Sequence, residues 1–200
     1  MVLDEGSDSS GMTRSIPIEK IKDDCIIAWA MNGEALRPEQ GYPIRLVVPG
    51  WEGNMWVKWL RRIEFGDKPY MTREETSKYT DLLSDGKARM FTWVMDAKSV
   101  ITSPCPEKPV LQKGIHQIRG LAWSGRGKIK RVDVSLDGGK NWKTAQLHSP
   151  VLEKSLTRFT IPFEWNGEEM LLQSRAIDET NYVQPTIKEL QNVRGGNSIY

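Results

Sequence analysis

Short apolar segments separated by turns dominate the second half of the chain and predict strands rather than helices. Six such segments follow Thr92, around residues 93–101, 115–124, 128–136, 142–147, 156–163 and 169–177. Turn sequences stand between them, for example Asp137-Gly138-Gly139, a pattern that favours a tight hairpin. This rhythm is typical of a β-sandwich of immunoglobulin size, and we expect two packed antiparallel sheets with Trp123 and Trp142 at or near the core.

The first half of the chain is less regular than the second. Residues 4–12 are rich in Gly, Ser and Asp and predict a loop. Apolar positions in residues 18–30 fit one helical turn followed by a buried strand, and residues 44–48 predict another short strand. The alternation over residues 56–64 predicts a third strand, whereas residues 66–90 are polar and predict a long surface loop.

These patterns together predict a mainly β, α+β protein with two domains. Three prolines, Pro104, Pro106 and Pro109, mark the entry into the all-β half, and we place the boundary near residue 100. Residues 1–100 are then an irregular α+β domain, and residues 101–200 are an immunoglobulin-like β-sandwich.

Composition and charge argue against several classes of protein. The 200 residues are 38% hydrophobic and 27% charged, which is ordinary for a folded globular chain. Lys and Arg number 28 and Asp and Glu 26, and the net charge of +2 is too small to indicate a nucleic-acid or membrane-surface binder. The longest uncharged apolar run is residues 25–31, whereas a membrane span needs about 20 residues. The opening residues also lack the pattern of a secretory signal.

Neither the cysteines nor the histidines belong to a recognisable metal-binding or catalytic motif. Cys25 and Cys105 stand 80 positions apart without a second Cys or His beside either, which argues against a zinc or redox motif and favours two structural thiols. His116 and His148 have no adjacent Ser/Asp or Cys arrangement, so the sequence indicates no nucleophilic site.

Cationic side chains gather between residues 40 and 62, among glycine loops and tryptophans. They are Arg45, Lys58, Arg61 and Arg62. Such a cluster suits an anionic ligand, because arginine offers phosphate a bidentate fork and lysine offers a point charge. The alternative, which composition alone favours, is a charged sheet face with Trp56 and Trp59 in the core.

Three motifs in this order resemble those of the sulfite oxidase family. They are Met31-Asn32-Gly33, the stretch from Gly41-Tyr42-Pro43 to Pro49-Gly50, and Val57-Lys58-Trp59-Leu60. The second half is similar to the dimerisation domain of that family in three segments, Ala122-Trp123-Ser124-Gly125, Arg131 to Gly139, and Asn192-Val193-Arg194-Gly195. The segments 50–55 and 6–11 resemble, more narrowly, the sulfane dehydrogenase branch of bacterial sulfur oxidation.

The resemblance implies a molybdenum-molybdopterin cofactor in the intact enzyme and assigns five residues to it. The segment from Gln40 to Arg45 matches the one that contacts the phosphate side of the pterin, with Gln40 in place of the family's usual His. Trp56 and Lys58 fall on the short segment that holds the pterin, Trp56 through its backbone. Asp4 aligns with an acidic contact to the pterin.

Two further residues are implied at the reacting centre. Tyr79 lies 21 residues after Lys58, the spacing at which the family places an active-site tyrosine beside the metal. Arg194 matches an arginine that the C-terminal domain contributes to the anionic substrate pocket, where a fixed positive charge suits a sulfur anion. The alternatives are an exposed loop tyrosine and a surface arginine.

The function that the resemblance implies is that of part of a molybdenum-cofactor oxidoreductase. The intact enzyme is expected to oxidise sulfite or a protein-bound sulfane, to pass electrons to cytochrome c, and to reside in the periplasm. A homodimer through the C-terminal domain is implied, with a small sulfur anion or a sulfane carrier protein as substrate and with neither nucleic acid nor membrane as a partner.

One departure from the family concerns the metal. The family binds molybdenum through a cysteine in an earlier part of the cofactor domain, and neither Cys25 nor Cys105 falls in a matching context. We therefore expect no metal ligand in this chain, no retained cofactor and no activity of the chain alone. The alternative function is a non-catalytic immunoglobulin-like β-sandwich module for protein association.

Overall fold

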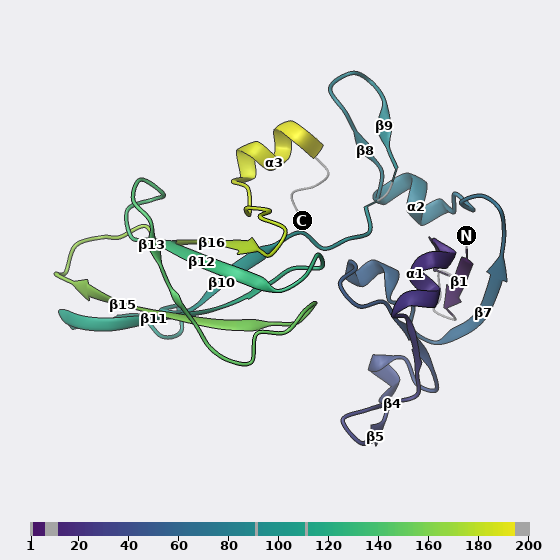
Figure 1. Cartoon of the computed structure of the whole chain (residues 1–200), viewed down its shortest axis with the longest axis horizontal. Coiled ribbons are helices and arrows are strands. Elements are labelled where there is room, and N and C mark those ends of the chain that lie inside the picture. Colours follow the sequence, from purple (N-terminus) through teal and green to yellow (C-terminus); the bar gives the residue numbers. More distant parts are fainter. Residues whose placement is uncertain (1, 7–11, 91, 111, 195–200) are drawn as a thin grey trace. The chain divides into compact units, whose positions relative to one another are not determined.

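The chain contains two compact units in the computed structural model, which describes residues 2–6, 12–90, 92–110 and 112–194 (Figure 1). The first unit is Met1–Trp93 together with Thr186–Tyr200, and the second is Val94–Pro185. The border between the two units thus falls between Trp93 and Val94, close to the predicted boundary near residue 100, and the segment from Thr186 onward is grouped with the first unit. No helix in the described ranges is long and apolar enough to cross a membrane.

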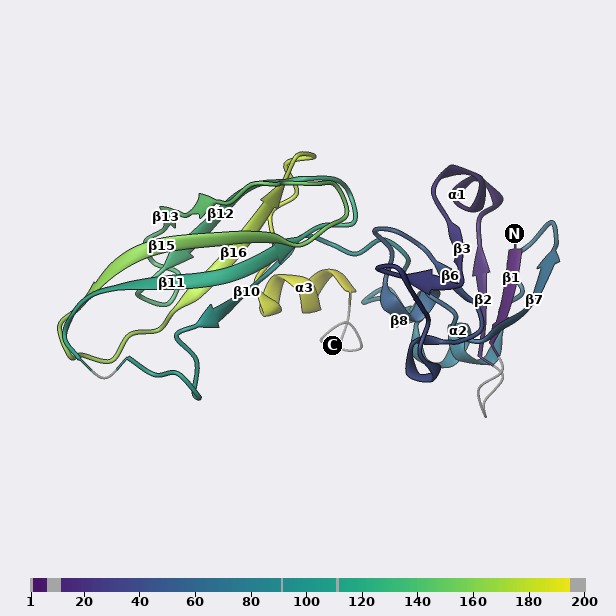
Figure 2. The same ribbon diagram turned by 90° about the horizontal axis from the view of Figure 1, so that it is seen from below.

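The second unit is built from two antiparallel sheets, with strand orders β10-β11-β15-β14 and β13-β12-β16. The strands are β10 (Lys98–Ser103), β11 (Gly114–Trp123), β12 (Ile129–Ser135), β13 (Lys143–Thr144), β14 (Gln146–Leu147), β15 (Thr157–Trp165) and β16 (Gln173–Asp178). The long strands β11 and β15 run side by side from Gly114 opposite Trp165 to Ala122 opposite Thr157 (Figure 2). The predicted β-rich fold is confirmed.

Alternation along the long strands β11 and β15 directs one side of each strand into a common core. Ile118 of β11, Val132 of β12 and Phe159 of β15 are fully buried. The buried cluster consists of Ala97, Ile118, Ala122, Ile129, Val132, Val134, Ala145, Phe159, Phe163 and Ala176. Because both sheets contribute to it, the core lies between them.

Trp123 and Trp142 are absent from this cluster, which corrects the expectation that they sit at or near the core. Trp123 follows the buried Ala122 on β11, so its side chain belongs to the opposite face of the strand. Trp142 is half-buried, its Nε1 donates to the Gly139 carbonyl at 2.9 Å, and its ring centroid lies 4.2 Å from the guanidinium carbon of Arg175. A buried indole N–H needs a polar partner, and the turn between β12 and β13 supplies one.

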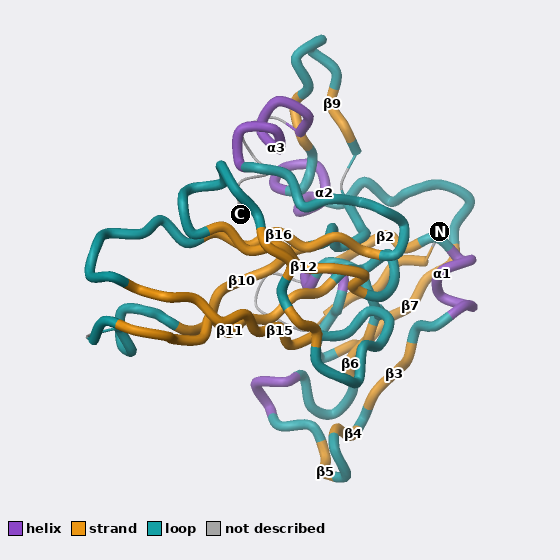
Figure 3. The backbone as a smooth tube through the Cα atoms, turned by 60° about the vertical axis from the view of Figure 1, so that its left-hand side comes forward, coloured by secondary structure: helices purple, strands orange, loops and turns teal. Residues whose placement is uncertain are grey.

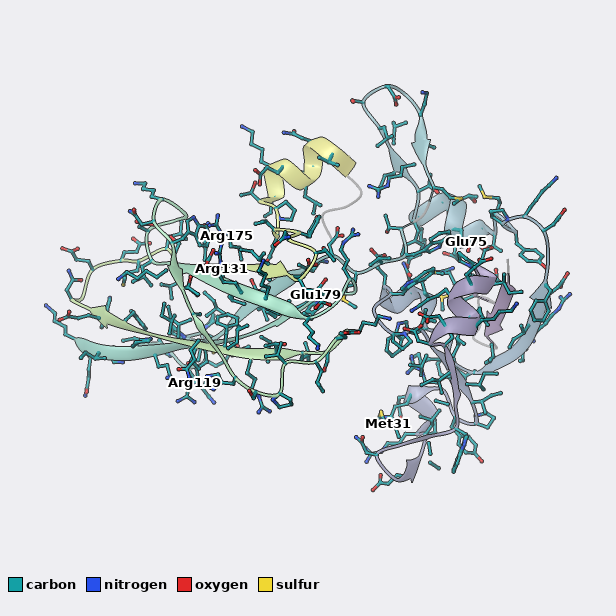
Figure 4. All side chains as sticks on the ribbon, viewed as in Figure 1. Met31, Glu75, Arg119, Arg131, Arg175 and Glu179 are labelled. Carbon is teal, nitrogen blue, oxygen red and sulfur yellow. The ribbon has the colours of Figure 1, made fainter. Side chains whose placement is uncertain are left out.

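A charge cluster occupies the smaller sheet of this unit, where Arg131 and Arg175 lie close together (Figure 4). Asp133 of β12 is buried, and its carboxylate pairs with Arg131 Nε at 3.1 Å and with Arg175 Nη2 at 3.3 Å. Thr144 donates a further hydrogen bond to it at 3.1 Å. The buried carboxylate is thus compensated by two cations, as a buried charge requires.

The first unit combines one three-stranded sheet, order β2-β1-β7, with three two-stranded pairs, and loops join these short elements (Figure 3). The strands are β1 (Val2–Gly6), β2 (Thr13–Ile16), β3 (Ile26–Ala28), β4 (Ala30–Met31), β5 (Glu34–Ala35), β6 (Arg45–Val47), β7 (Leu60–Phe65), β8 (Asp81–Leu82) and β9 (Ala88–Arg89). The helices are α1 (Ile18–Asp23), α2 (Arg73–Lys78) and α3 (Ile187–Arg194), with 3-10 turns η1 (Pro38–Gln40) and η2 (Gly53–Met55).

The long loop predicted over residues 66–90 is wrong, because this stretch contains α2 and the β8-β9 hairpin. The start of α2 is a capping box, in which Thr72 precedes the helix and Glu75 stands at its third position. Thr-x-x-Glu is a recognisable helix start. The polar composition of the stretch concealed it.

Two further predictions for the first unit need correction. Residues 4–12 were expected to be a loop, but β1 runs to Gly6, and residues 7–11 lie outside the described part. The strand expected over residues 56–64 begins only at Leu60. Trp59 has φ of 52°, a left-handed conformation that no strand residue adopts, so the preceding segment is a loop.

The apolar run at residues 25–31 forms strands but is not buried. Ile26 is 55% exposed, Ile27 51% and Trp29 70%. The strand β3 pairs with β6 alone in a two-stranded sheet, so over the part of the chain that the structure describes these side chains stay at the surface. Burial was predicted from hydrophobicity alone, and hydrophobicity does not specify what covers a strand.

Candidate functional site

The turn η1 gathers four of the residues that the sequence assigned to a cofactor. Arg45, the first residue of β6, donates from Nη1 to the Gln40 carbonyl at 3.1 Å and from Nη2 to the Trp56 carbonyl at 3.3 Å. Lys58 donates from Nζ to the carbonyl of Glu39 in the same turn at 2.9 Å. We call Gln40, Arg45, Trp56 and Lys58 the cationic cradle.

Gly41 allows this turn to approach Lys58 closely. Its φ is 104°, and a Cβ added there would lie 2.8 Å from the Cβ of Lys58. Only glycine combines this left-handed conformation with so close a neighbour. The Gly-x-Pro sequence that follows the turn is therefore part of the architecture of the cradle.

Tryptophans support the two cations rather than filling a core. The indole of Trp59 donates from Nε1 to the Pro38 carbonyl at 3.0 Å, and the ammonium of Lys58 lies 4.7 Å from its ring centroid. The guanidinium carbon of Arg45 lies 5.7 Å from the ring of Trp56. Both tryptophans are half-buried, so the alternative that placed them in the core is wrong.

One charged donor of the cradle lacks a hydrogen-bond acceptor. The Nε of Arg45 is buried and has no hydrogen-bond partner, and burial lowers the pKa of this guanidinium from its ordinary value. No carboxylate pairs with Arg45 or Lys58 among the residues that the structure describes. An orphaned charged donor is costly, and an anionic oxygen would satisfy it. The donor set therefore fits a phosphate group.

Tyr79 stands at the C-terminal end of α2 and is half-buried, so it is not an exposed loop residue. Its ring centroid lies 4.7 Å from the guanidinium carbon of Arg14, a residue of β2 that is 2% exposed. Arg14 also donates from Nε to the carbonyl of Asn54 in η2 at 3.0 Å. Since η2 leads directly into Trp56, Arg14 connects Tyr79 to the segment that carries the cradle.

Asp4 and Arg194 are placed by their backbones only. Asp4 lies in β1 opposite Arg14 of β2 and Ile63 of β7, and Arg194 is the last residue of α3. Their side chains lie outside the described part of the structure, so their assigned roles remain predictions.

The two cysteines belong to different units. Cys25 lies between α1 and β3, Cys105 follows β10, and both are half-buried. Among the described residues, no three His, Cys, Asp or Glu side chains are grouped as metal ligands.

Arg14 and Glu75 were missed by the sequence interpretation. Glu75 had a usable signal, the capping box with Thr72. Arg14 had none, because a single arginine in a short polar stretch is indistinguishable from a surface residue until its strand partner and Tyr79 are known.

Two protein-family models match successive parts of the chain. Residues 1–74 match the model "Oxidoreductase molybdopterin binding domain", and residues 89–200 match "Mo-co oxidoreductase dimerisation domain". All five residues that the resemblance assigns to the cofactor, Asp4, Gln40, Arg45, Trp56 and Lys58, lie in the first match, and Tyr79 lies between the two.

The chain is also similar to individual proteins of the sulfite oxidase family. The chain is 33% identical over 187 residues to sulfite oxidase of Gallus gallus, covering 86% of this chain and 40% of that protein. Mitochondrial sulfite oxidase of Homo sapiens is 30% identical over 211 residues, covering 96% and 38%. The crystal structure of the sulfane dehydrogenase SoxCD from Paracoccus pantotrophus matches with a TM-score of 0.94 and 62% identity, covering 100% of this chain and 51% of that one. The chain thus spans about half or less of the length of these proteins.

Proposed function

We propose that this chain, which belongs to the sulfite oxidase family of molybdenum-cofactor oxidoreductases, is part of an enzyme that oxidises sulfite or a protein-bound sulfane. The single observation that carries the proposal is the cationic cradle, in which Arg45 keeps a buried Nε without a partner. The identity of 62% to a sulfane dehydrogenase favours a sulfane over sulfite.

The cradle residues divide the work of holding the cofactor. Arg45 and Lys58 bind its phosphate by charge, and Gln40 contributes a polar contact from the same turn. Trp56 contributes its backbone, whose carbonyl already orients Arg45. Asp4 provides an acidic contact to the pterin. When bound, the molybdenum cofactor supplies two-electron redox chemistry.

Tyr79 and Arg194 act on the substrate. Arg194 attracts the sulfur anion by a charge that persists at every physiological pH. Tyr79 donates a hydrogen bond from its hydroxyl and orients the sulfur for reaction. Electrons leave the enzyme toward a cytochrome c.

The remaining parts of the proposal concern the metal ligand, the domains and the location of the intact enzyme. Neither Cys25 nor Cys105 is the cysteine ligand of the metal, and both thiols are structural. This chain alone neither retains the cofactor nor catalyses the reaction. Residues 1–100 are the C-terminal portion of the cofactor domain, and residues 101–200 form a homodimer. The enzyme works in the periplasm.

Steady-state kinetics of the intact enzyme test this function, with sulfite and a protein-bound sulfane as alternative substrates and cytochrome c as acceptor. Arg194→Gln should lower kcat/KM by an amount that corresponds to about 2 kcal/mol or more of lost transition-state stabilisation, because a desolvated charged contact is lost. Lys188→Gln, an exposed cation on the same helix, is the matched control and should change little.

Three results contradict parts of the proposal. An unchanged kcat/KM in Arg194→Gln removes that residue from the site. Turnover of neither substrate, in protein that carries its cofactor, rejects the sulfur-oxidising function. An intact protein that binds no pterin and only self-associates would instead support the alternative, a non-catalytic β-sandwich module.

A further inference from the structure

Arg14 is a cation in an unusual position. It is 2% exposed and is the bulkiest of the fully buried side chains in the described residues. Its Nε donates to the Asn54 carbonyl at 3.0 Å and its Nη1 to the Thr13 carbonyl at 2.8 Å. Burying a guanidinium is costly, and a well-packed apolar side chain of similar volume usually serves stability as well or better. The contacts of Arg14 therefore call for an explanation other than stability.

Those contacts converge on the proposed site. The guanidinium carbon lies 4.7 Å from the centroid of the Tyr79 ring, within the range of a cation–π interaction. Asn54, which accepts from Nε, belongs to η2, two residues before Trp56. The backbone register places Arg14 directly opposite Asp4 of β1.

Tyr79 is held on its other side by α2. Glu75 of that helix, labelled in Figure 4, is fully buried and accepts hydrogen bonds from the amide and the hydroxyl of Ser15. Ser15 is the neighbour of Arg14 on β2. The same two residues of one strand thus fix both the helix that ends at Tyr79 and the ring of Tyr79 itself.

We propose that Arg14 is a positioning residue for Tyr79, which sets the phenol ring relative to the cationic cradle. This proposal rests on the proposed function, because it presumes that Tyr79 contacts the substrate. The guanidinium does two things that a lysine cannot do together: it lies over the Tyr79 ring and directs fixed N–H groups to the carbonyls of Asn54 and Thr13. Its effect on turnover is exerted through Tyr79 alone.

A double-mutant cycle in the intact, cofactor-loaded enzyme tests the positioning. Arg14→Met should lower kcat about tenfold, since small displacements of an oriented group cost this much or more. In the Tyr79→Phe background the same change should lower kcat less than about twofold, because the hydroxyl that it positions is gone. Arg14→Lys keeps the charge and should rescue only part of the loss.

A second readout needs no activity and uses the 200-residue chain itself. NMR of the protein with ring-labelled tyrosine identifies the Tyr79 signal by its loss in Tyr79→Phe. That signal should shift in Arg14→Met and in Arg14→Lys. The matched control is Lys20→Met, because Lys20 is also a largely buried cation beside an aromatic ring, 5.6 Å from the centroid of Trp51. It should leave the Tyr79 signal unchanged.

The outcomes separate the two proposals. Equal losses of kcat for Arg14→Met in both backgrounds, or a Tyr79 signal that does not move, overturn the positioning role and leave the proposed function intact. A Tyr79→Phe enzyme with parental kinetics overturns the role of Tyr79 and, with it, the role of Arg14.

Discussion

Glu75 accepts two hydrogen bonds from Ser15, 60 positions earlier in the chain, one from the backbone amide and one from the hydroxyl. Its second oxygen also accepts from the Thr72 amide at 3.1 Å. A single buried carboxylate therefore starts α2 and fixes that helix to β2. Tyr79 owes its place to this attachment.

Glu75→Gln should destabilise the protein, because the amide turns an N–H toward donors that need an acceptor. A buried unsatisfied donor costs about 1–3 kcal/mol. Thermal unfolding should show a lower Tm than the parent. Glu74→Gln is the control, since it alters only the pair of Glu74 with Lys78 at 3.6 Å, whose lysine is 69% exposed, and should cost less than about 0.5 kcal/mol. Equal Tm values for the two variants would rule out the anchoring role.

Gly41→Ala should destabilise the cradle for two reasons, the left-handed φ of 104° and the 2.8 Å approach to Lys58. Gly86→Ala is the matched control, because Gly86 has φ of 81° but nothing within 4 Å of an added Cβ. We expect about 1 kcal/mol for the control from backbone strain alone and a larger loss, about 2–3 kcal/mol, at Gly41. Chemical denaturation measures both. A Gly41→Ala protein as stable as the control would show that the close approach is not a constraint.

The environment of Asp137 leads us to expect that the second unit becomes less stable at acid pH. Hydrogen bonds from the Asn141 amide, the Asn141 side chain and Ser135 lower the pKa of this carboxyl well below its usual range. A carboxyl with a depressed folded-state pKa adds stability above its unfolded pKa, about 3.9, and that stability is lost as pH falls toward the folded value.

The denaturation midpoint of the parent should therefore fall as pH drops below about 4. Asp137→Asn should make that decline shallower, and Asn141→Ala, which removes a side-chain donor, should do so in part. Midpoints at a series of pH values between neutral and strongly acidic decide the matter. Parallel acid profiles for parent and Asp137→Asn would mean that another carboxyl is responsible.

The second unit was predictable because its two longest strands, β11 and β15, follow the simple period of two. Ile118 and Ala122 lie on one side of β11, and the hairpin at Asp137-Gly138-Gly139 stands where turn chemistry put it. Trp142 departs from the prediction because its indole N–H donates to the Gly139 carbonyl in the turn between β12 and β13. Hydrophobicity alone had placed it inside.

The first unit was harder because its elements are short and are stabilised by distant partners. The helix α2 has six residues, too few for hydrophobic periodicity to show, and its anchor Ser15 lies far away in sequence. The exposure of Ile27 at 51% depends on what packs over β3, which local pattern does not contain. Of the site, the cradle could be inferred from its motifs, whereas Arg14 required the fold.

The central claim is that Arg45 and its neighbours bind the anionic end of a pterin cofactor. It is tested most directly by the pterin content of the purified intact enzyme, measured by fluorescence after oxidative release, in Arg45→Gln and in Arg37→Gln. Arg37 is the control, because it belongs to the same turn but its side chain is 72% exposed. We predict that Arg45→Gln lowers the pterin content about tenfold, as expected for the loss of a charge-assisted contact, while Arg37→Gln keeps the parental content. A folded Arg45→Gln enzyme with a full complement of pterin would contradict the account.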